Sequence, residues 1–374
     1  MPSSTSNSDI KSNLKKDYYF HENRPIPDLP WKKISLMAVL IMLLGVIAWE
    51  YNARIIWKYP TGHYIDNKGL WAIQRNRIDR SDENTVAIIG SSRILFDLDL
   101  DTYEKTTGTR PIQLALVGTN PRPLLKDLAT DEDFKGLLII GITPGSFFRH
   151  SGGLFGKNPE YYKKESPTQW LSQQISMLIE PHLAFYDNSN WALFTLIERM
   201  DFENSVANYN PVSQIWELSF SKKDRNTKMF WKVEDDPAYQ HNAQMAWRTL
   251  MQLGDKMGPA PFDHDAYMLG VVADVNAIRS RGGEVVFIRT PSSGDYRPRE
   301  HKNQPREKFW DRLLTQTNSV GVHFEDHSEL QGFRIPEWSH LHSEDAPKFT
   351  KALVPILDAK LKAANKKGII KKER

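Results

Sequence analysis

The sequence predicts a three-layer α/β fold, in which helices cover both faces of a five-stranded parallel sheet. Three observations support this prediction: short apolar runs recur along the chain, amphipathic stretches separate them, and the runs end in small or polar residues. Strands that are buried on both faces have this composition, and right-handed helical crossovers join parallel neighbours. The predicted strands are Thr85–Ile89, Ile112–Val117, Leu137–Ile142, Val285–Ile288 and Val322–Phe324.

Four stretches between and after these strands have apolar residues at helical spacing. A proline opens the first of them, and Gly282-Gly283 ends the second, as glycine commonly does after a helix. The predicted helices are Pro123–Leu128, His264–Arg281, Pro305–Leu314 and Asp345–Ala363.

Residues 150–262 interrupt this alternation, because they contain no convincing strand. We interpret them as a mainly helical insertion between the third and fourth strands. The insertion is rich in tryptophan, and we interpret these side chains as core or lid residues, with a sugar-stacking platform as the alternative. Helices are expected at Thr168–Ile179, Trp191–Met200 and Tyr239–Leu253.

An uncharged stretch near the N-terminus, residues 34–49, predicts a membrane-spanning helix. At about 1.5 Å per residue it covers roughly 24 Å, slightly less than the ~30 Å hydrocarbon core. Trp31 precedes it and Tyr51 follows it, and such aromatic side chains suit the membrane interfaces. A cleaved signal peptide and a buried core helix are the alternatives. The long segment ahead of the stretch disfavours the signal peptide.

The charges around this stretch predict its orientation. Lys32 and Lys33 precede it, whereas Glu50 offsets Arg54 and Lys58 after it. The positive-inside rule then places the N-terminus in the cytoplasm and the large domain outside the inner (plasma) membrane, in the periplasm or extracellular space. The predicted division is a disordered cytoplasmic tail (1–33), the anchor (34–49), a lead-in (50–84), the α/β domain (85–363) and a basic tail (364–374). We interpret the basic tail as a solvated terminus, with anionic lipid as the alternative contact.

The composition excludes several kinds of site. The chain has no cysteine, which excludes disulfides, cysteine-based zinc sites and thiol nucleophiles. Its net charge of +3 gives no reason to expect nucleic acid as a partner. Asp263-His264-Asp265 contains metal-ligating residue types, but consecutive residues rarely reach one ion, so we interpret it as a helix cap. No metal or cofactor is expected.

Two of the predicted strands end in turns that could carry chemistry. The first ends in Gly90-Ser91-Ser92, where glycine permits a tight turn and a serine becomes exposed at the carboxyl edge of the sheet. The second ends in Gly118-Thr119-Asn120, where glycine allows close backbone approach and Asn120 adds an amide donor. Such donors stabilise a developing oxyanion. Each turn taken alone is also compatible with a plain loop or a helix cap.

The segment between the last two predicted elements supplies a possible base. Glu337 precedes His340 by three positions, so both can share one turn. A carboxylate that holds the imidazole tautomer lets the histidine take a proton from a serine hydroxyl near neutral pH. His342 is the alternative base.

The joint pattern resembles the SGNH/GDSL hydrolase superfamily, which implies a flavodoxin-like sheet. The resemblance makes Ser92 the nucleophile and Gly118 an oxyanion donor beside the Ser92 backbone N–H. It places Glu337 and His340 in the last block, with glutamate instead of aspartate. The third block of the family has an asparagine that has no counterpart here. Asn120 is the expected substitute, and an oxyanion hole with only two members is the alternative.

The membrane anchor and the Gly-Ser-Ser turn resemble a narrower branch that moves or removes O-acyl groups, acetyl foremost, on cell-envelope polysaccharides. A membrane-bound O-acyltransferase is the partner that this resemblance implies. A catalytically degenerate subunit that binds glycan or such a partner is one alternative, and a doubly wound fold that binds phosphate is another. Arg93 is expected to brace the first turn through an internal carboxylate. The residues expected to line the pocket are Ser91, Arg93, Arg289, Ser292, Trp338 and His342.

Overall fold

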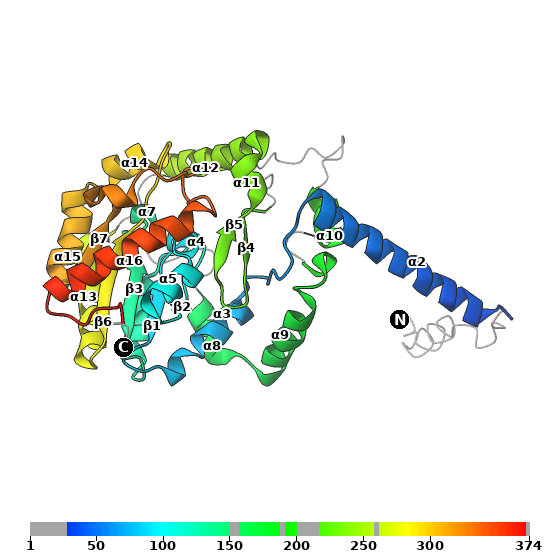
Figure 1. Ribbon diagram of the computed structural model, residues 1–374, viewed down its shortest axis with the longest axis horizontal. Coiled ribbons are helices and arrows are strands. Elements are labelled where there is room, and N and C mark those ends of the chain that lie inside the picture. The colour runs from blue at the N-terminus through cyan, green and yellow to red at the C-terminus, as the bar shows by residue number, and fades with distance from the viewer. Residues whose placement is uncertain (1–27, 150–156, 188–190, 200–216, 258–261, 372–374) are drawn as a thin grey trace, which may run out of the picture. The chain divides into compact units, whose positions relative to one another are not determined.

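The computed structural model describes residues 28–149, 157–187, 191–199, 217–257 and 262–371 (Figure 1). The chain divides into two compact units, Met1–Tyr51 and Asn52–Arg374. Most of the predicted cytoplasmic tail lies outside the described residues.

The first unit contains a helix, α2 (Trp31–Tyr51), that extends past the predicted span at both ends. With the following π-helical turn η1 (Asn52–Ile56) it forms a helix long and apolar enough to cross a membrane, with a mean hydropathy of 2.1 over its most apolar 18 residues. The 21 residues of α2 correspond to roughly 31 Å, which matches the hydrocarbon core. None of the side chains of α2 is buried, which disfavours the core-helix alternative.

The second unit is built on the predicted five-stranded parallel sheet, whose strand order is β2-β1-β3-β6-β7. The second strand is shorter than expected, but the chain continues beside β1, since the N–H groups of Leu114 and Leu116 donate to Ile88 and Gly90. The sheet comprises β1 (Val86–Ile89), β2 (Ile112–Gln113), β3 (Leu137–Gly141), β6 (Glu284–Arg289) and β7 (Val320–His323).

Helices cover both faces of the sheet, as a three-layer fold requires. Successive strand residues point to opposite faces, so Ala87 packs into one apolar core and Ile88 into the other. One face is covered by α3 (Lys68–Arg75), α6 (Arg122–Thr130), α13 (His264–Ser280), η5 (Glu307–Asp311) and α15 (Arg312–Thr317). The other is covered by α4 (Ser92–Asp97), α5 (Leu100–Thr107) and α16 (Asp345–Ala363).

The insertion contains the predicted helices, but it also contains an antiparallel hairpin that the sequence prediction missed. The hairpin joins β4 (Ser219–Ser221) to β5 (Thr227–Met229), and three-residue strands give too little alternation to recognise. Arg225 at its tip is fully buried and donates to Asp66 and to two carbonyls of the chain at β2, so the hairpin caps that edge. The helices are α8 (Asn158–Lys164), α9 (Pro167–Ile179), η3 (Ala184–Tyr186), α10 (Leu193–Arg199), α11 (Trp231–Asp235) and α12 (Pro237–Met257).

Parts of the predicted lead-in (50–84) and of the predicted basic tail (364–374) pack on the α/β domain, and the second compact unit includes them. In the lead-in, the buried Trp71 of α3 donates to the carbonyl of Leu114. At the other end, residues 364–371 fold back on the domain, and the N–H groups of Ile369 and Ile370 donate to Asp358. Both segments are held in place by contacts with other parts of the folded unit, and a local sequence pattern does not show such contacts. The remaining elements are η2 (Ile78–Arg80), α7 (Pro144–Phe147), α14 (Tyr296–Asn303), η6 (Phe324–Asp326) and η7 (Ser328–Leu330).

Candidate active site

Ser92 is the first residue of α4, immediately after the turn that leaves β1. Gly90 in this turn has φ +155°, and an added Cβ would lie 2.4 Å from Cγ2 of Ile94. Only glycine therefore lets α4 start this close to the sheet. The next residue, Ser91, has its hydroxyl 2.6 Å from that of Thr143, which follows β3. The loops after β1 and β3 are thus tied together beside the half-buried Ser92.

Glu337 and His340 form a buried acid–imidazole pair. The Nδ1 atom of His340 lies 3.0 Å from Oε1 of Glu337, which also accepts the backbone N–H groups of His340 at 2.6 Å and Ser339 at 3.2 Å. Both side chains are almost fully buried. Burial alone would raise the pKa of Glu337, but the facing imidazole and these hydrogen bonds outweigh it and lower the pKa. An ionised Glu337 fixes the tautomer that leaves Nε2 free to accept a proton.

The loop that carries this pair lies against α4. The ring of His340 stacks on that of Phe96 with centroids 4.3 Å apart, and Phe96 is four residues after Ser92, on the same helix face. The Nε atom of Arg93 donates to the hydroxyl of Ser339, and the N–H of Leu341 donates to Asp97 at 2.9 Å. The structure therefore brings the predicted base to the helix that begins at the predicted nucleophile.

The Nε2 atom of His340 is buried and has no hydrogen-bond partner among the described residues. It is not hydrogen-bonded to the hydroxyl of Ser92 in this conformation, and catalytic hydrogen bonds are often loose before substrate binds. An unpartnered buried imidazole nitrogen costs stability. Beside α4, this nitrogen is open to a proton from a serine hydroxyl.

His342, the alternative base, has both of its ring nitrogens in contact with neighbouring polar groups. The Nε2 atom of His342 lies 3.2 Å from Nη1 of Arg334, and Nδ1 accepts the N–H of Glu344 and lies 3.5 Å from a carboxylate oxygen of Glu234. Because both ring nitrogens of His342 are engaged, His340 is the better candidate.

The oxyanion donors are only partly as predicted. Gly118 has φ +58°, a left-handed conformation that explains the glycine after the second strand. Asn120 is fully buried, and its amide nitrogen donates to the carbonyls of Phe147 and Arg149. These bonds use both amide hydrogens, so the geometry does not support the predicted oxyanion role of Asn120. The side chain instead anchors the loop after β3.

The predicted pocket residues at the end of β6 belong to a buried ion network. Arg289 contacts Glu300, and the Ser292 hydroxyl donates to the same carboxylate at 2.7 Å. Arg93 reaches the other oxygen of Glu300 at 2.6 Å, as expected of a brace for the first turn. Burial lowers the pKa of Arg289 even though Glu300 opposes this shift. The network supports the loops, and its members are not free for substrate.

Trp338 lies between the acid and the base in a strained conformation. Its φ is +75°, which is unusual for a residue with a Cβ, and its carbonyl accepts the N–H of Ser293 at 2.9 Å. Arg248 of α12 stacks over the indole with 5.2 Å to the ring centroid. The half-buried Trp338 remains available at the surface of the site. Backbone strain of this kind concentrates at functional sites.

The insertion contacts the loop of Glu337 and His340 directly, which the sequence did not indicate. The indole Nε1 of Trp247 on α12 donates to Oε2 of Glu337 at 2.5 Å. One helical turn earlier, the amide of Gln244 donates to the carbonyl of Pro336 at 2.7 Å. One face of helix α12 therefore holds the loop that carries Glu337 and His340. No local pattern could identify this role, because the two segments are 90 residues apart.

Trp247→Phe is expected to destabilise the chain in a pH-dependent way. The folded pKa of Glu337 lies below its ordinary value of 4.5, so its ionised form contributes stability above that pH and loses it as the pH falls further. Removing a donor to a buried charge should cost about 1.5–3 kcal/mol at pH 7. The difference from wild type should shrink as the pH falls below 4.5 and through the lowered pKa of the folded carboxyl group. Denaturant unfolding at several pH values measures this, with the exposed Trp170→Phe as control. Equal losses at every pH would contradict it.

Asp97 is a second carboxyl group beside the base. It is fully buried, and burial raises its pKa to about 7. One of its oxygens accepts the N–H of Leu341, which ties α4 to the loop that carries His340. Glu337, whose pKa is lowered, is the carboxylate that contacts the imidazole of His340 directly.

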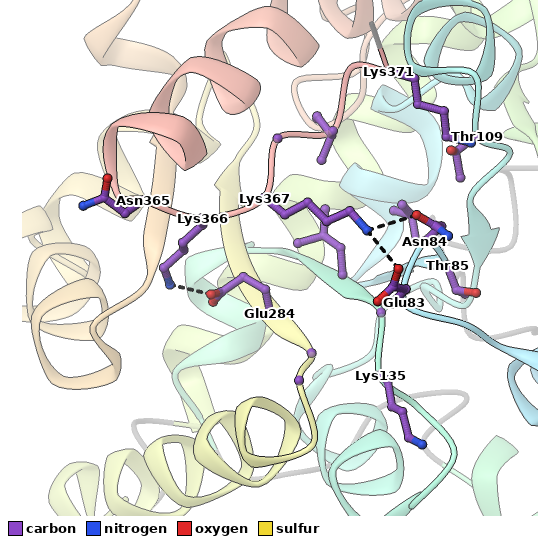
Figure 2. A pocket seen from close by; sticks show the side chains of 17 residues that line it. Glu83, Asn84, Thr85, Thr109, Lys135, Glu284, Asn365, Lys366, Lys367 and Lys371 are labelled. Atoms are coloured by element: carbon purple, nitrogen blue, oxygen red, sulfur yellow. Dashed lines mark hydrogen bonds and ion pairs between the residues drawn. The ribbon is translucent and has the colours of Figure 1, made fainter.

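The structure also contains a cleft at the amino ends of β1, β3 and β6, between the sheet and residues 365–371 (Figure 2). Lys366 pairs with Glu284 at 2.6 Å, and Lys367 donates to Asn84 at 3.0 Å. No predicted site residue lines it. Open α/β sheets bind ligands at the carboxyl ends of their strands, where Ser92 lies.

Within the described ranges, no group of three or more His, Asp or Glu side chains could hold a metal ion. Asp263 accepts the N–H groups of Asp265 and Ala266, which confirms the helix cap. A scan against protein-family models finds no match to the chain, and a search of curated proteins also finds none.

Proposed function

We propose that the chain is a membrane-anchored serine esterase or O-acyltransferase of the SGNH/GDSL type. The observation that carries the proposal is the buried Glu337–His340 pair, whose unpartnered Nε2 lies beside the helix that begins at Ser92. A serine nucleophile, a histidine base and a carboxylate that orients the histidine are the groups that serine hydrolases use for acyl transfer. The loops after β1 and β3, which meet here, flank the position where strand order reverses in the sheet, a place where α/β proteins bind ligands.

In the proposed acylation step, the Ser92 hydroxyl attacks the carbonyl carbon of an acyl ester while its proton passes to Nε2 of His340. Ionised Glu337 stabilises the imidazolium. The backbone N–H groups of Ser92 and Gly118 are the proposed oxyanion donors. The tetrahedral intermediate collapses, the alcohol leaves with the proton from His340, and the acyl group remains on Ser92 as an ester.

In the second step, an acceptor hydroxyl gives its proton to His340 and attacks the acyl-serine, and His340 then returns the proton to Oγ of Ser92 as the bond between Oγ and the acyl carbon breaks. If the acceptor is water, the products are a carboxylic acid and free Ser92; if it is a sugar hydroxyl, the product is a new ester. The resemblance favours acyl esters, acetyl foremost, of cell-envelope or exported polysaccharide as substrates. It also favours a membrane-bound O-acyltransferase as a partner. The anchor α2 and the charges around it favour an extracytoplasmic catalytic domain on the inner (plasma) membrane.

Covalent labelling tests the proposal. A fluorophosphonate should label the wild-type chain once, at Ser92, because a triad-activated serine attacks phosphorus readily. Ser92→Ala should abolish the label and the turnover of an aryl acetate. Ser91→Ala should keep both, because the Ser91 hydroxyl is hydrogen-bonded to Thr143. A folded wild-type chain that takes no label and turns over no acetyl ester would overturn the proposal.

A catalytically degenerate subunit that binds glycan or a partner is the second candidate. The engaged amide of Asn120 favours it, since the oxyanion site then has one donor fewer than expected. This candidate predicts binding of acetylated oligosaccharide that Ser92→Ala and His340→Ala leave unchanged, together with the absence of label.

A further inference from the structure

Helix α9 of the insertion turns an apolar face toward solvent. Trp170, Leu171, Ile175 and Leu178 share this face and are 47–73% exposed to solvent. The buried side chains of the helix are Gln173 and Met177. An ordinary surface helix turns its apolar face toward the core. Helix α9 contains no charged residue, and its outward face is apolar. Such a face indicates a surface that an apolar partner covers.

Helix α10 extends the same kind of surface. Leu193, Phe194 and Ile197 are 60%, 70% and 46% exposed, and their spacing also places them on one side of a helix. Large apolar side chains at this density are uncommon on a surface that faces only water.

Both helices are tied to the segment that directly follows the anchor. Trp191, just before α10, packs edge to face on Trp57 with centroids 5.6 Å apart. The Tyr59 hydroxyl donates to Asp187 at 2.6 Å. After α9, the carbonyl of Pro181 accepts the N–H of Gly62. Trp57 is six residues after the end of α2, so the chain between them spans at most about 20 Å.

The side chains around this segment are those of a membrane interface. Lys232 lies with its ammonium 3.9 Å from the ring centroid of Trp57, and Lys58 lies 4.9 Å from that of Trp231. The Trp231 indole donates to the carbonyl of Trp57. Tryptophan with lysine is typical of the level of the lipid headgroups, where the ring is half-immersed and the ammonium faces water.

We infer that the outward faces of α9 and α10 dock on the bilayer, with their apolar side chains immersed at the boundary between headgroups and acyl chains. Lipid is the occupant favoured here because the surface is uncharged along α9 and covalently held within reach of the membrane. The docking would hold the domain in a fixed orientation to the bilayer. The inference rests on the proposed anchoring by α2 and is independent of the proposed chemistry.

The absence of native cysteine allows a direct test in the full-length chain. Leu178→Cys and Phe194→Cys carry a nitroxide in lipid nanodiscs that hold one chain each. Leu269→Cys is the control, because Leu269 is 72% exposed, against 73% for Leu178, and lies on α13, at the opposite end of the second unit from α9 (Figure 1). Relaxation by oxygen should exceed relaxation by a water-soluble nickel chelate at positions 178 and 194, and the reverse should hold at 269.

Nickel access at positions 178 and 194 equal to that at 269 would overturn the inference and would point to a protein partner absent from the nanodiscs. Protection from both reagents that appears only with several chains per disc would also overturn it, in favour of contact between copies. Flotation of the chain with lipid vesicles is measured first, so failure of the anchor is distinguished from failure of docking. Fluorophosphonate labelling in the same samples reports separately on the proposed chemistry. Unchanged thermal unfolding of the three variants confirms that each remains folded.

Discussion

His340→Ala is expected to lower the rate of Ser92 acylation by about four to six orders of magnitude, the range seen when a triad base is removed. Without the imidazole, the Ser92 hydroxyl loses the base proposed to take its proton, and Asp97, the other carboxyl group beside α4, is engaged by the backbone N–H of Leu341. The rate of fluorophosphonate labelling and the turnover of an aryl acetate measure the effect.

His342→Ala is the matched control, two residues further along the same buried loop. Its ring nitrogens are engaged by Arg334 and the N–H of Glu344, so its removal should change acylation by less than about tenfold. Thermal unfolding of both variants separates lost chemistry from lost folding. A larger loss of acylation in a folded His342→Ala than in a folded His340→Ala would reassign the base.

Gly90→Ala is expected to destabilise the chain by about 3–5 kcal/mol, the sum of backbone strain at positive φ and overpacking. The added methyl group would lie 2.4 Å from Cγ2 of Ile94 and 3.0 Å from the carbonyl oxygen of Gly141. Ile94 is buried in the core and cannot yield without moving α4. Denaturant unfolding measures the loss. Because α4 carries Ser92, labelling of the folded fraction should also slow.

Gly145→Ala supplies the comparison, since an added methyl group there meets nothing within 4 Å and the residue lies in the short helix α7. It should be neutral or stabilise the chain by up to about 1 kcal/mol. Similar stabilities of the two variants would show that the turn after β1 tolerates a side chain, against the argument for glycine.

The strands of the sheet and its main helices could be predicted from the sequence because each depends on the local spacing of apolar residues. Apolar runs ending in small residues identified all five strands of the sheet, and Asp345–Ala363 matches α16 residue for residue. The three-residue hairpin strands and the packed tail could not be predicted, since their stability comes from contacts with Asp66 and Asp358, far away in the chain.

The candidate site also has features that the sequence predicts and features that depend on the tertiary structure. The sequence by itself determined which residue types stand at the ends of the strands, Ser92 and Gly118, and that Glu337 and His340 share one turn. Only the tertiary structure engaged both ring nitrogens of His342, placed the amide of Asn120 against two carbonyls, and brought Trp247 to Glu337. The physical reason is that hydrogen bonding of a buried group depends on every segment that packs around it, whereas strand and helix periodicity depends on near neighbours alone.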